Sequence, residues 1–259
     1  MNTIPPVFLS HGSPMLLLEP GATGAAWRRL AADLPRPRAI LAVSAHWTTR
    51  VAAVSAAPRP ATIHDFYGFP DSLYDLDYAA PGSTELAAQV AGLVPGIKVD
   101  ALRGLDHGAW APLSLMYPAA DIPVIQLAVM PEADAAAHHE LGRRLAPLAR
   151  EGVLLLASGS LTHNLYEMIP DAPDDRALPH VAAFSDWFAD MLGKGDAAAL
   201  LDWEASAPYG RRAHPTPEHL LPLFVALGAA GDGARASAVH RGYQLGALAM
   251  DAYRFDPAA

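Results

Sequence analysis

The stretch Ala-Ile-Leu-Ala-Val-Ser-Ala at residues 39–45, followed directly by His46 and Trp47, indicates the fold of this chain. Apolar residues run through it without alternation, which is typical of a strand buried on both faces of a sheet. Further apolar runs of strand length occur at residues 7–10, 124–130 and 153–157. Such strands favour a largely parallel central sheet.

Segments with helical spacing lie between and after these strands, at residues 23–34, 84–93, 133–149, 182–192 and 217–227. The alternation predicts an α/β fold with a central, largely parallel sheet flanked by helices. The sequence shows no repeat or linker, so we expect a single domain over residues 1–259. The tail at 238–255 allows either two strands around Gly242 and Gly246 or a helix.

The composition narrows the classes of partner and cofactor. The 18 Lys and Arg against 27 Asp and Glu give a net charge of −9, without a basic run, so we expect no nucleic-acid partner. No apolar run approaches the roughly 18 to 20 residues that span a bilayer, and the N-terminus lacks a basic signal region. We therefore expect a cytoplasmic protein without a membrane partner. Cysteine is absent, so a metal must be held by His, Asp or Glu.

Two histidines stand where a predicted strand ends. His11 follows Val-Phe-Leu-Ser at 7–10, and His46 follows the run at 39–45. Ligands of open α/β sheets bind outside the carboxyl ends of the strands, so both side chains are expected to face one crevice. A lone histidine at a strand end is more often structural, but its recurrence on two strands favours a metal site.

Three more histidines lie near the ends of other predicted elements. His163 follows the strand at 153–157 by a few residues, and His107 lies in a glycine-bearing loop that enters a helix. In Pro-Thr-Pro-Glu-His at 215–219, Thr216 can cap a helix that has Pro217 at its first position. We expect His219 in the first turn of that helix.

The other histidines carry weaker signals. We expect His138 and His139 to be solvated within a helix, and His180 and His240 to have structural roles. The place of His214 near the site is ambiguous. The aromatic loop at 62–70 contains His64 and either lines a pocket or packs on the surface. Gly-x-Ser-x-Gly, Gly-x-Gly-x-x-Gly, Walker and His-Glu-x-x-His motifs are absent from the sequence.

Six strings occur in order along the chain: Phe-Leu-Ser-His-Gly-Ser-Pro-Met at 8–15, Ser-Ala-His-Trp at 44–47, Thr-Ile-His-Asp-Phe at 62–66, Asp-His-Gly-Ala-Trp at 106–110, Ser-Gly-Ser-Leu-Thr-His-Asn-Leu at 158–165 and Pro-Thr-Pro-Glu-His at 215–219. Together they resemble the class III extradiol ring-cleavage dioxygenases, within them the 4,5-DOPA dioxygenase branch. The similarity extends from residue 8 to about residue 250. It implies a single catalytic domain of α/β fold.

The resemblance implies a non-haem Fe(II) enzyme that uses O2 to open a catechol, such as DOPA, beside its hydroxylated carbons, giving a muconate semialdehyde. His11, His46 and His219 match the metal ligands of the family. Glu218 is an alternative to His219 as the third ligand, and Zn(II) could occupy the site in the purified protein. His163 matches a catalytic acid/base or a further ligand, and so the set of ligands stays open.

Groups that act on the substrate can also be named. His107 resembles the second active-site histidine of the family. From the residue types alone, we expect apolar walls from aromatic side chains that can hold a flat ring, namely Trp47, Phe66, Tyr67, Phe69 and Trp110. We expect His64 to hydrogen-bond a polar substituent of the catechol, such as the carboxylate of DOPA.

Two other functions remain open from the sequence. A zinc-dependent hydrolase would use the same three histidines to activate water. A non-catalytic protein would bind a metal or a small ligand, although it would need no spare acid/base such as His107 or His163. Neither the natural catechol nor the oligomeric state follows from the sequence.

Overall fold

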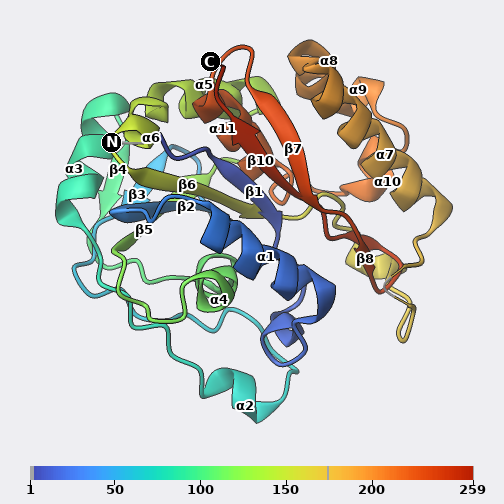
Figure 1. Ribbon diagram of the computed structural model, residues 1–259, viewed down its shortest axis with the longest axis horizontal. Helices are drawn as coiled ribbons and strands as arrows, with labels where there is room; N and C mark the ends of the chain where they lie inside the picture. Colours follow the sequence, from blue (N-terminus) through green and yellow to red (C-terminus); the bar gives the residue numbers. More distant parts are fainter. Residues whose placement is uncertain (1–2, 174, 259) are drawn as a thin grey trace.

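The fold is built on one mixed sheet (Figure 1). In residues 3–173 and 175–258, which the computed structural model describes, eight strands pair in the order β4-β3-β5-β2-β6-β1-β10-β7. Their bounds are β1 Val7–Ser10, β2 Ala39–Thr48, β3 Ala53–Ser55, β4 Lys98–Asp100, β5 Val124–Val129, β6 Val153–Gly159, β7 Arg235–His240 and β10 Ala252–Asp256. A small separate sheet pairs β8 Tyr243–Gln244 with β9 Leu248–Ala249.

The four strands predicted from the sequence form the parallel centre of the sheet, β5-β2-β6-β1. Both faces of these strands are buried, because Phe8 and Leu41 join one apolar cluster while Leu9 and Ile40 join the other. The edges are antiparallel where β3 meets β5 and where β10 lies between β1 and β7. This arrangement confirms the predicted α/β fold with a mostly parallel central sheet.

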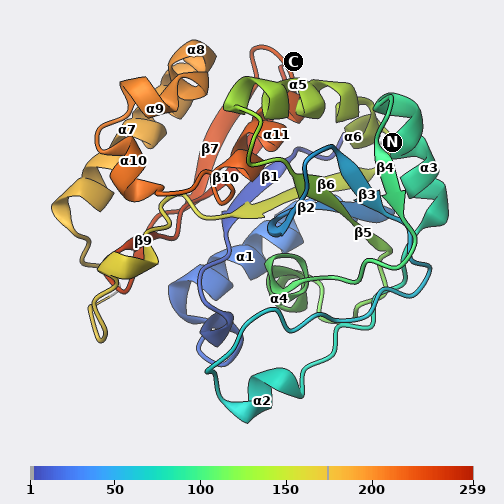
Figure 2. The same cartoon turned by 180° about the vertical axis from the view of Figure 1, so that it is seen from behind.

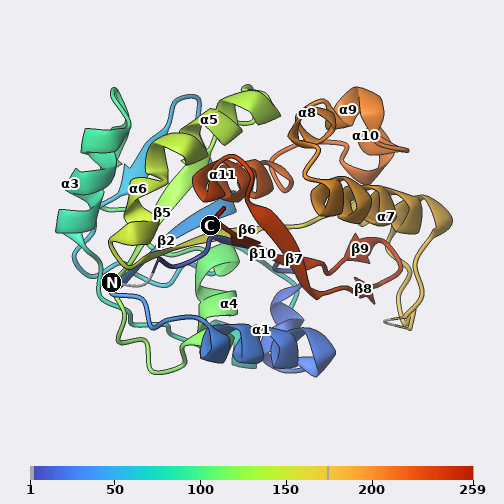
Figure 3. The ribbon, with the colours of Figure 1, turned by 45° about the horizontal axis from the view of Figure 1, so that its top comes forward.

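Helices cover both faces of the sheet (Figures 1 and 3). One layer contains α1 Gly21–Asp33 and α4 His107–Met116, and the other contains α3 Thr84–Leu93, α5 Ala135–Leu145, α6 Pro147–Arg150, α7 Pro179–Lys194 and α11 Leu221–Ala230. Shorter helical turns are η1 Pro14–Leu17, α2 Asp71–Tyr74, η2 Leu165–Glu167, α8 Ala197–Leu201, α9 Trp203–Ser206 and α10 Gly210–Ala213. Among the described residues, none of these helices has the length and apolarity needed to cross a bilayer.

Proline explains where two predicted helices differ from the observed ones. The helix expected over 133–149 is divided into α5 and α6 at Pro147, which has no N–H for the helical ladder. The helix expected to start at Pro217 starts at Leu221 instead. Pro222 cannot donate to the carbonyl of Glu218, so residues 218–220 form a turn. His219 therefore lies just before α11, not in its first turn.

Strands occupy the C-terminal tail, which excludes the helical alternative. β10 pairs with both β1 and β7, and β8 and β9 form the hairpin around Gly246. The hairpin follows from backbone conformation, because Leu245 and Gly246 both have positive φ angles, of 52° and 67°. Figure 2 shows this hairpin from behind, at one end of the molecule.

β2 is longer than predicted, and its last residues are irregular. The strand continues to Thr48, so His46 and Trp47 lie within it and not directly after it. Ser44 pairs with Ala128, but Thr48 already pairs with the next residue of β5, so three residues of β2 bulge out of register. This bulge re-aims the His46 side chain at the carboxyl edge of the sheet.

Candidate metal centre and its cavity

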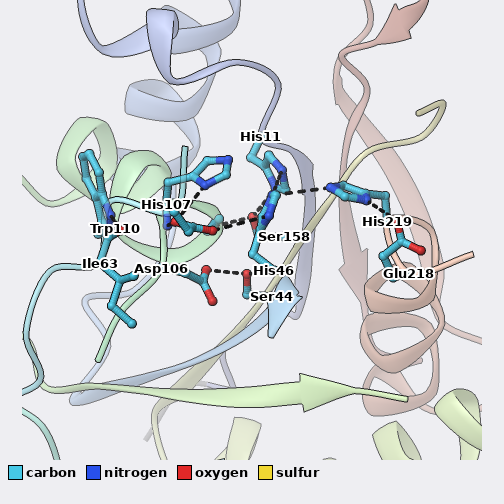
Figure 4. Close-up of polar contacts among 12 residues, drawn as sticks. His11, Ser44, His46, Ile63, Asp106, His107, Trp110, Ser158, Glu218 and His219 are labelled. Carbon is cyan, nitrogen blue, oxygen red and sulfur yellow. Dashed lines mark hydrogen bonds and ion pairs between the residues drawn. The ribbon is translucent and has the colours of Figure 1, made fainter. Parts of the chain in front are cut away.

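Three imidazoles from distant parts of the chain converge at the carboxyl edge of the sheet (Figure 4). His11 follows β1, His46 lies in the bulge of β2, and His219 precedes α11. Nε2 of His46 lies 2.9 Å from Nε2 of His11 and 3.4 Å from Nε2 of His219. Two nitrogens bound about 2.1 Å from one metal at a right angle are about 3 Å apart, so this spacing fits a shared ion.

The other ring nitrogen of His11 has a defined partner. Ser158 donates its hydroxyl proton to the carbonyl of Gly108, and its Oγ lies 3.0 Å from Nδ1 of His11. With the hydroxyl proton used, Oγ accepts from Nδ1–H of His11, and Nε2 of that ring carries a free lone pair. This partner holds His11 in the tautomer that a metal ligand needs.

His219 is oriented in the same way by a carboxylate. Oε1 of Glu218 lies 3.0 Å from Nδ1 of His219 and accepts a second hydrogen bond, from Thr216, at 3.0 Å. The Nε2 atom of His219 therefore faces His46, and Glu218 lies on the far side of the ring. Nε2 of His219, and not the Glu218 carboxylate, is thus grouped with the nitrogens of His11 and His46.

His163 lies directly against this group. Its ring stacks on that of His219 with centroids 3.4 Å apart and planes 10° apart. Its backbone N–H donates to the carbonyl of Ala213 at 2.8 Å, which ties the residues after β6 to the end of α10. His163 also lines the cavity in front of the three imidazoles, so it is placed to reach a substrate.

His107 and His46 both contact a carboxylate that sequence reasoning missed. Nδ1 of His107 lies 3.0 Å from Oδ1 of Asp65, and Nδ1 of His46 lies 3.5 Å from Oδ2. Burial acts to raise the pKa of Asp65, but its hydrogen bonds and charge interaction with His107 outweigh burial and lower this pKa to about 2. Metal-bound histidines usually donate their second N–H to a carboxylate or carbonyl, so a search of the sequence for acidic residues near the predicted histidines could have found Asp65.

A second missed acid, Asp106, supports the chain beneath the histidines. It is fully buried, and its carboxylate accepts from Ser44 at 2.6 Å, from Arg103 at 2.6 Å and from Gln126 at 2.8 Å. These bonds join the start of α4, which carries His107, to β2 and β5. A buried carboxylate with three donors is a structural anchor for the site.

The imidazoles of the cluster are neutral at pH 7. Burial, followed by the neighbouring histidines, lowers the pKa values of His11 and His219 well below their usual range. Burial and then His107 lower the pKa of His46 to about 3, and burial and then His46 lower the pKa of His163 to about 4. Neutral imidazole is the form that binds a metal, so the donor set fits a divalent cation.

A cavity of about 440 Å³ opens in front of these histidines. Its lining includes His11, His46, His107 and His163. Most of the remaining lining side chains are apolar, namely Pro14, Met15, Phe66, Phe69, Leu165, Met168, Leu245 and Leu248. A volume of this size and an apolar lining suit one flat ring beside the metal.

Some of the predicted pocket residues are located elsewhere, and those expectations are corrected. Trp47 points to the other side of β2, where it packs with Ala53 and Ala128 and its ring lies 5.2 Å from the Arg103 guanidinium. Successive side chains of a strand face opposite ways, so His46 and Trp47 do not share a cavity. Tyr67 is 92% exposed.

Trp110 and His64 support the loop instead of lining the cavity. Trp110 is fully buried and donates its ring N–H to the carbonyl of Ile63 at 2.9 Å. Nε2 of His64 lies 2.9 Å from the carbonyl oxygen of Leu76, to which it donates. The expectation that His64 binds a substrate carboxylate is therefore not supported by its position.

The remaining histidines have other partners. His138 is fully buried and accepts the backbone N–H of Met130 at 3.1 Å, so the expectation of a solvated side chain was wrong; His139 is half-buried. His180 lies 2.7 Å from Glu167, and His240 lies 3.0 Å from the hydroxyl of Thr23. His214 is buried beside Phe184 and Trp203 and donates to the carbonyl of Leu161 at 2.9 Å.

Comparisons with known proteins agree with this site. Residues 6–253 match the family described as the catalytic LigB subunit of aromatic ring-opening dioxygenase. The chain is 42% identical over 257 residues to 4,5-DOPA dioxygenase extradiol of Beta vulgaris, with 96% of this chain and 95% of that protein covered. It is also 42% identical over 257 residues to the Escherichia coli K12 protein of the same name, covering 95% and 93%.

A solved structure gives the same result for the fold. The crystal structure of an uncharacterized protein from Escherichia coli K12 matches with a TM-score of 0.84 and 35% identity, covering 97% of this chain and 99% of that one. A histidine cluster at the carboxyl edge of a mostly parallel sheet, beside an apolar cavity, defines a metal-dependent enzyme that acts on a small ring. The chain belongs to the class III extradiol ring-cleavage dioxygenases, the family of the catalytic LigB subunit. It cleaves catechol rings in a metal-dependent reaction, and these relatives give the hydrolase alternative no support.

Proposed function

We propose that this chain cleaves a DOPA-like catechol with O2 and Fe(II), giving a muconate semialdehyde. Relatives at 42% identity over nearly the whole chain bear the name 4,5-DOPA dioxygenase extradiol, which supports this choice of substrate. The observation that carries the proposal is the convergence of three Nε2 atoms in front of an apolar cavity. His11, His46 and His219 would hold the ion.

Three neutral histidines leave about half of an octahedral coordination shell open. Bound Fe(II) would activate O2 and lower the pKa of a catechol hydroxyl by its positive charge. The protein's own contribution is positional, because Phe66 and Phe69 line the cavity together with the histidines and can hold the ring.

His163 is our first candidate for proton transfer. It lines the cavity, and with its pKa lowered to about 4 it is unprotonated at neutral pH and able to accept a hydroxyl proton. The same imidazole can return this proton later in the reaction. His107 lines the same cavity beside His46, with ring centroids 3.9 Å apart, and is the second candidate.

Oxygen uptake tests the proposal. The purified chain is stripped of metal, reconstituted anaerobically with Fe(II) and mixed with air-saturated buffer and a panel of catechols that includes DOPA. We expect one O2 consumed for each ring opened and a coloured semialdehyde product. The Zn(II)-loaded chain and His11→Ala are the controls and should be inactive. Ring opening by the Zn(II) form, or no O2 uptake by the Fe(II) form with any catechol, would contradict the proposal.

A further inference from the structure

Residues 61–66, called the strap here, cross the front of the site in a fixed position. Leu105 donates its backbone N–H to the carbonyl of Ala61 at 2.8 Å, and Ile63 donates to the carbonyl of Leu105 at 2.7 Å. The ring N–H of Trp110 bonds to the carbonyl of Ile63 at 2.9 Å. These three bonds tie the strap to the segment that carries His107. Asp65 is therefore held in place by the backbone on its N-terminal side.

The two oxygens of Asp65 face two different imidazoles. Oδ1 lies 3.0 Å from Nδ1 of His107 and also accepts the backbone N–H of His107 at 2.9 Å. Oδ2 lies 3.5 Å from Nδ1 of His46. The Asp65 side chain is 23% exposed, and those of His46 and His107 are 21% and 8% exposed. One partly buried carboxylate thus contacts residues of β2 and α4 at once.

Each imidazole of the proposed ligand set has an oxygen beside its Nδ1. Oγ of Ser158 lies beside His11, Oε1 of Glu218 beside His219, and Oδ2 of Asp65 beside His46. Asp65 differs from the other two because it is shared with His107, whose ring lies 3.9 Å from that of His46, centroid to centroid. A carboxylate beside Nδ1 stabilises the tautomer with its proton on Nδ1 and leaves Nε2 bare.

We propose that Asp65 is a positioning residue that holds His46 and His107 together in the Nδ1–H tautomer. A metal ligand and a candidate proton acceptor are then oriented by the same side chain, and both rings present an unprotonated Nε2. This inference rests on the proposed function only in naming His46 as a ligand. In the chain without metal His107 reports the effect, because Nε2 of His46 lies 2.9 Å from Nε2 of His11 and one of these two nitrogens carries a proton when no ion is bound.

NMR of the metal-free full chain tests the tautomers directly. Long-range ¹H–¹⁵N spectra distinguish the two histidine tautomers, with His46→Gln and His107→Gln used to assign the signals. We expect Nδ1–H for His107 in the wild type. In Asp65→Asn, one carboxylate oxygen becomes an NH2 group that cannot accept, so the share of His107 in the Nδ1–H tautomer should fall. Unchanged tautomers in Asp65→Asn would overturn the proposal.

Metal affinity gives the second measurement, by competition of Zn(II) with a chelator. Loss of the oxygen partner of a metal-bound histidine costs roughly 10- to 100-fold in affinity, so Asp65→Asn should bind Zn(II) more weakly by that factor. Asp65→Glu should recover part of the loss. Asp77→Asn is the matched control, because exposed Asp77 supports the same loop through the hydroxyl of Thr62 at 2.6 Å without contacting an imidazole.

The outcomes separate this role from a structural one. Equal losses of Zn(II) affinity in Asp65→Asn and Asp77→Asn would mean that the loop has lost its fold, and the proposal would be wrong. If the wild type bound no Zn(II) at this site, the proposed function would fail. The tautomer measurement would still decide the role of Asp65 in that case.

Discussion

The two walls of the cavity are built in different ways. The metal wall consists of His11, His46, His107 and His163, and the ring wall consists of Phe66, Phe69, Leu165 and Met168. Backbone hydrogen bonds join the segments of the metal wall, for example from His11 to the carbonyl of Gly159 at 2.8 Å. In the ring wall the side chains pack on one another, as the rings of Phe66 and Phe69 do with centroids 5.4 Å apart, and within the strap backbone bonds reach only the residues before Phe66.

This difference teaches which parts of a site follow from a sequence pattern. A residue that leaves a buried parallel strand is placed by the register of its neighbours, and its direction is known within narrow limits. A residue in a loop is placed by the contacts that the loop makes, and no periodic pattern in the sequence predicts those contacts. We therefore expect substitutions in the metal wall to impair the enzyme more than substitutions in the ring wall.

The largest effect is expected from His163→Ala in the metal wall. Because His163 is a proton acceptor in our proposal and not a ligand, the variant should keep its metal and lose kcat by roughly 10² to 10⁴, the range for general acid–base groups. Steady-state kinetics and metal analysis of the Fe(II) form measure the two quantities. His240→Ala, whose imidazole bonds to Thr23 outside the cavity, is the control.

Two outcomes would change the assignment of His163. Loss of the metal would make it a ligand, in line with its stacking on His219 at 3.4 Å between ring centroids. Full activity would transfer the proton-acceptor role to His107. Either result would show that position along the metal wall does not by itself determine a residue's role.

Buried His214, which packs against Phe184 and Trp203, shows how burial shifts the pKa of an imidazole that does not line the cavity. Burial, with a smaller contribution from the charge of His163, lowers its folded pKa to about 4, although its bond to the Leu161 carbonyl opposes the shift. Unfolded His214, with a pKa near 6.5, takes up a proton below that pH before the folded form does. The free energy of unfolding therefore falls as pH decreases from about 6.5 to about 4.

His214→Gln removes this proton uptake and keeps an N–H donor for the Leu161 carbonyl. Between pH 7 and pH 5, the contribution of His214 should fall by about 2 kcal/mol. We expect the stability difference between wild type and variant to change by that amount, measured by urea unfolding of metal-free protein. A difference that is constant with pH would show that the pKa of His214 is ordinary in the folded state.

The parallel centre of the sheet and the convergence of His11 and His46 could be predicted from residues alone. Both follow from buried strands whose carboxyl ends meet at one edge. The place of His219 needed the resemblance to the family, because the turn before α11 joins the site only through tertiary bonds such as Ser160 N–H to the carbonyl of His219 at 2.8 Å. Pro222 shifts the start of α11, and the hydrophobic periodicity of the sequence does not predict this shift.

The oxygen partners of the imidazoles could not be predicted with the same reasoning. Ser158 and Asp65 reach His11 and His46 from strands and loops far away in sequence. Trp47 was misplaced because the predicted strand ended at residue 45, so the alternation of side chains along β2 was not extended to His46 and Trp47. Trp110 was misplaced because the sequence does not distinguish an indole that lines a pocket from a buried one whose N–H bonds to a backbone carbonyl, here that of Ile63.

The ring wall should show a smaller effect than the metal wall. Phe66→Ala removes an aromatic face that lies against Phe69 and His107, with centroids 5.4 and 5.6 Å apart. We expect KM for the catechol to rise about 10-fold, equivalent to about 1.4 kcal/mol of lost binding, with kcat changed much less. Tyr67→Ala, at a neighbouring residue that is 92% exposed, should leave KM unchanged. A loss of kcat equal to the rise in KM would place Phe66 in the positioning of the reacting groups.

The smallest effect is expected from His64→Ala, which tests whether the loop behind the ring wall takes part in recognition at all. Its Nε2 bonds to the carbonyl of Leu76, and its ring packs at 5.5 Å from that of Trp110, centroid to centroid. Loss of one such bond lowers the free energy of unfolding by about 1 kcal/mol. KM should then change by the same small factor for DOPA and for unsubstituted catechol, because His64 is not among the side chains that line the cavity. A hydrogen bond to a substrate carboxylate would instead be worth about 1.5 to 3 kcal/mol and would weaken binding of DOPA alone by roughly 10- to 150-fold. Such a selective loss would show that the loop rearranges when substrate binds and that His64 belongs to the ring wall.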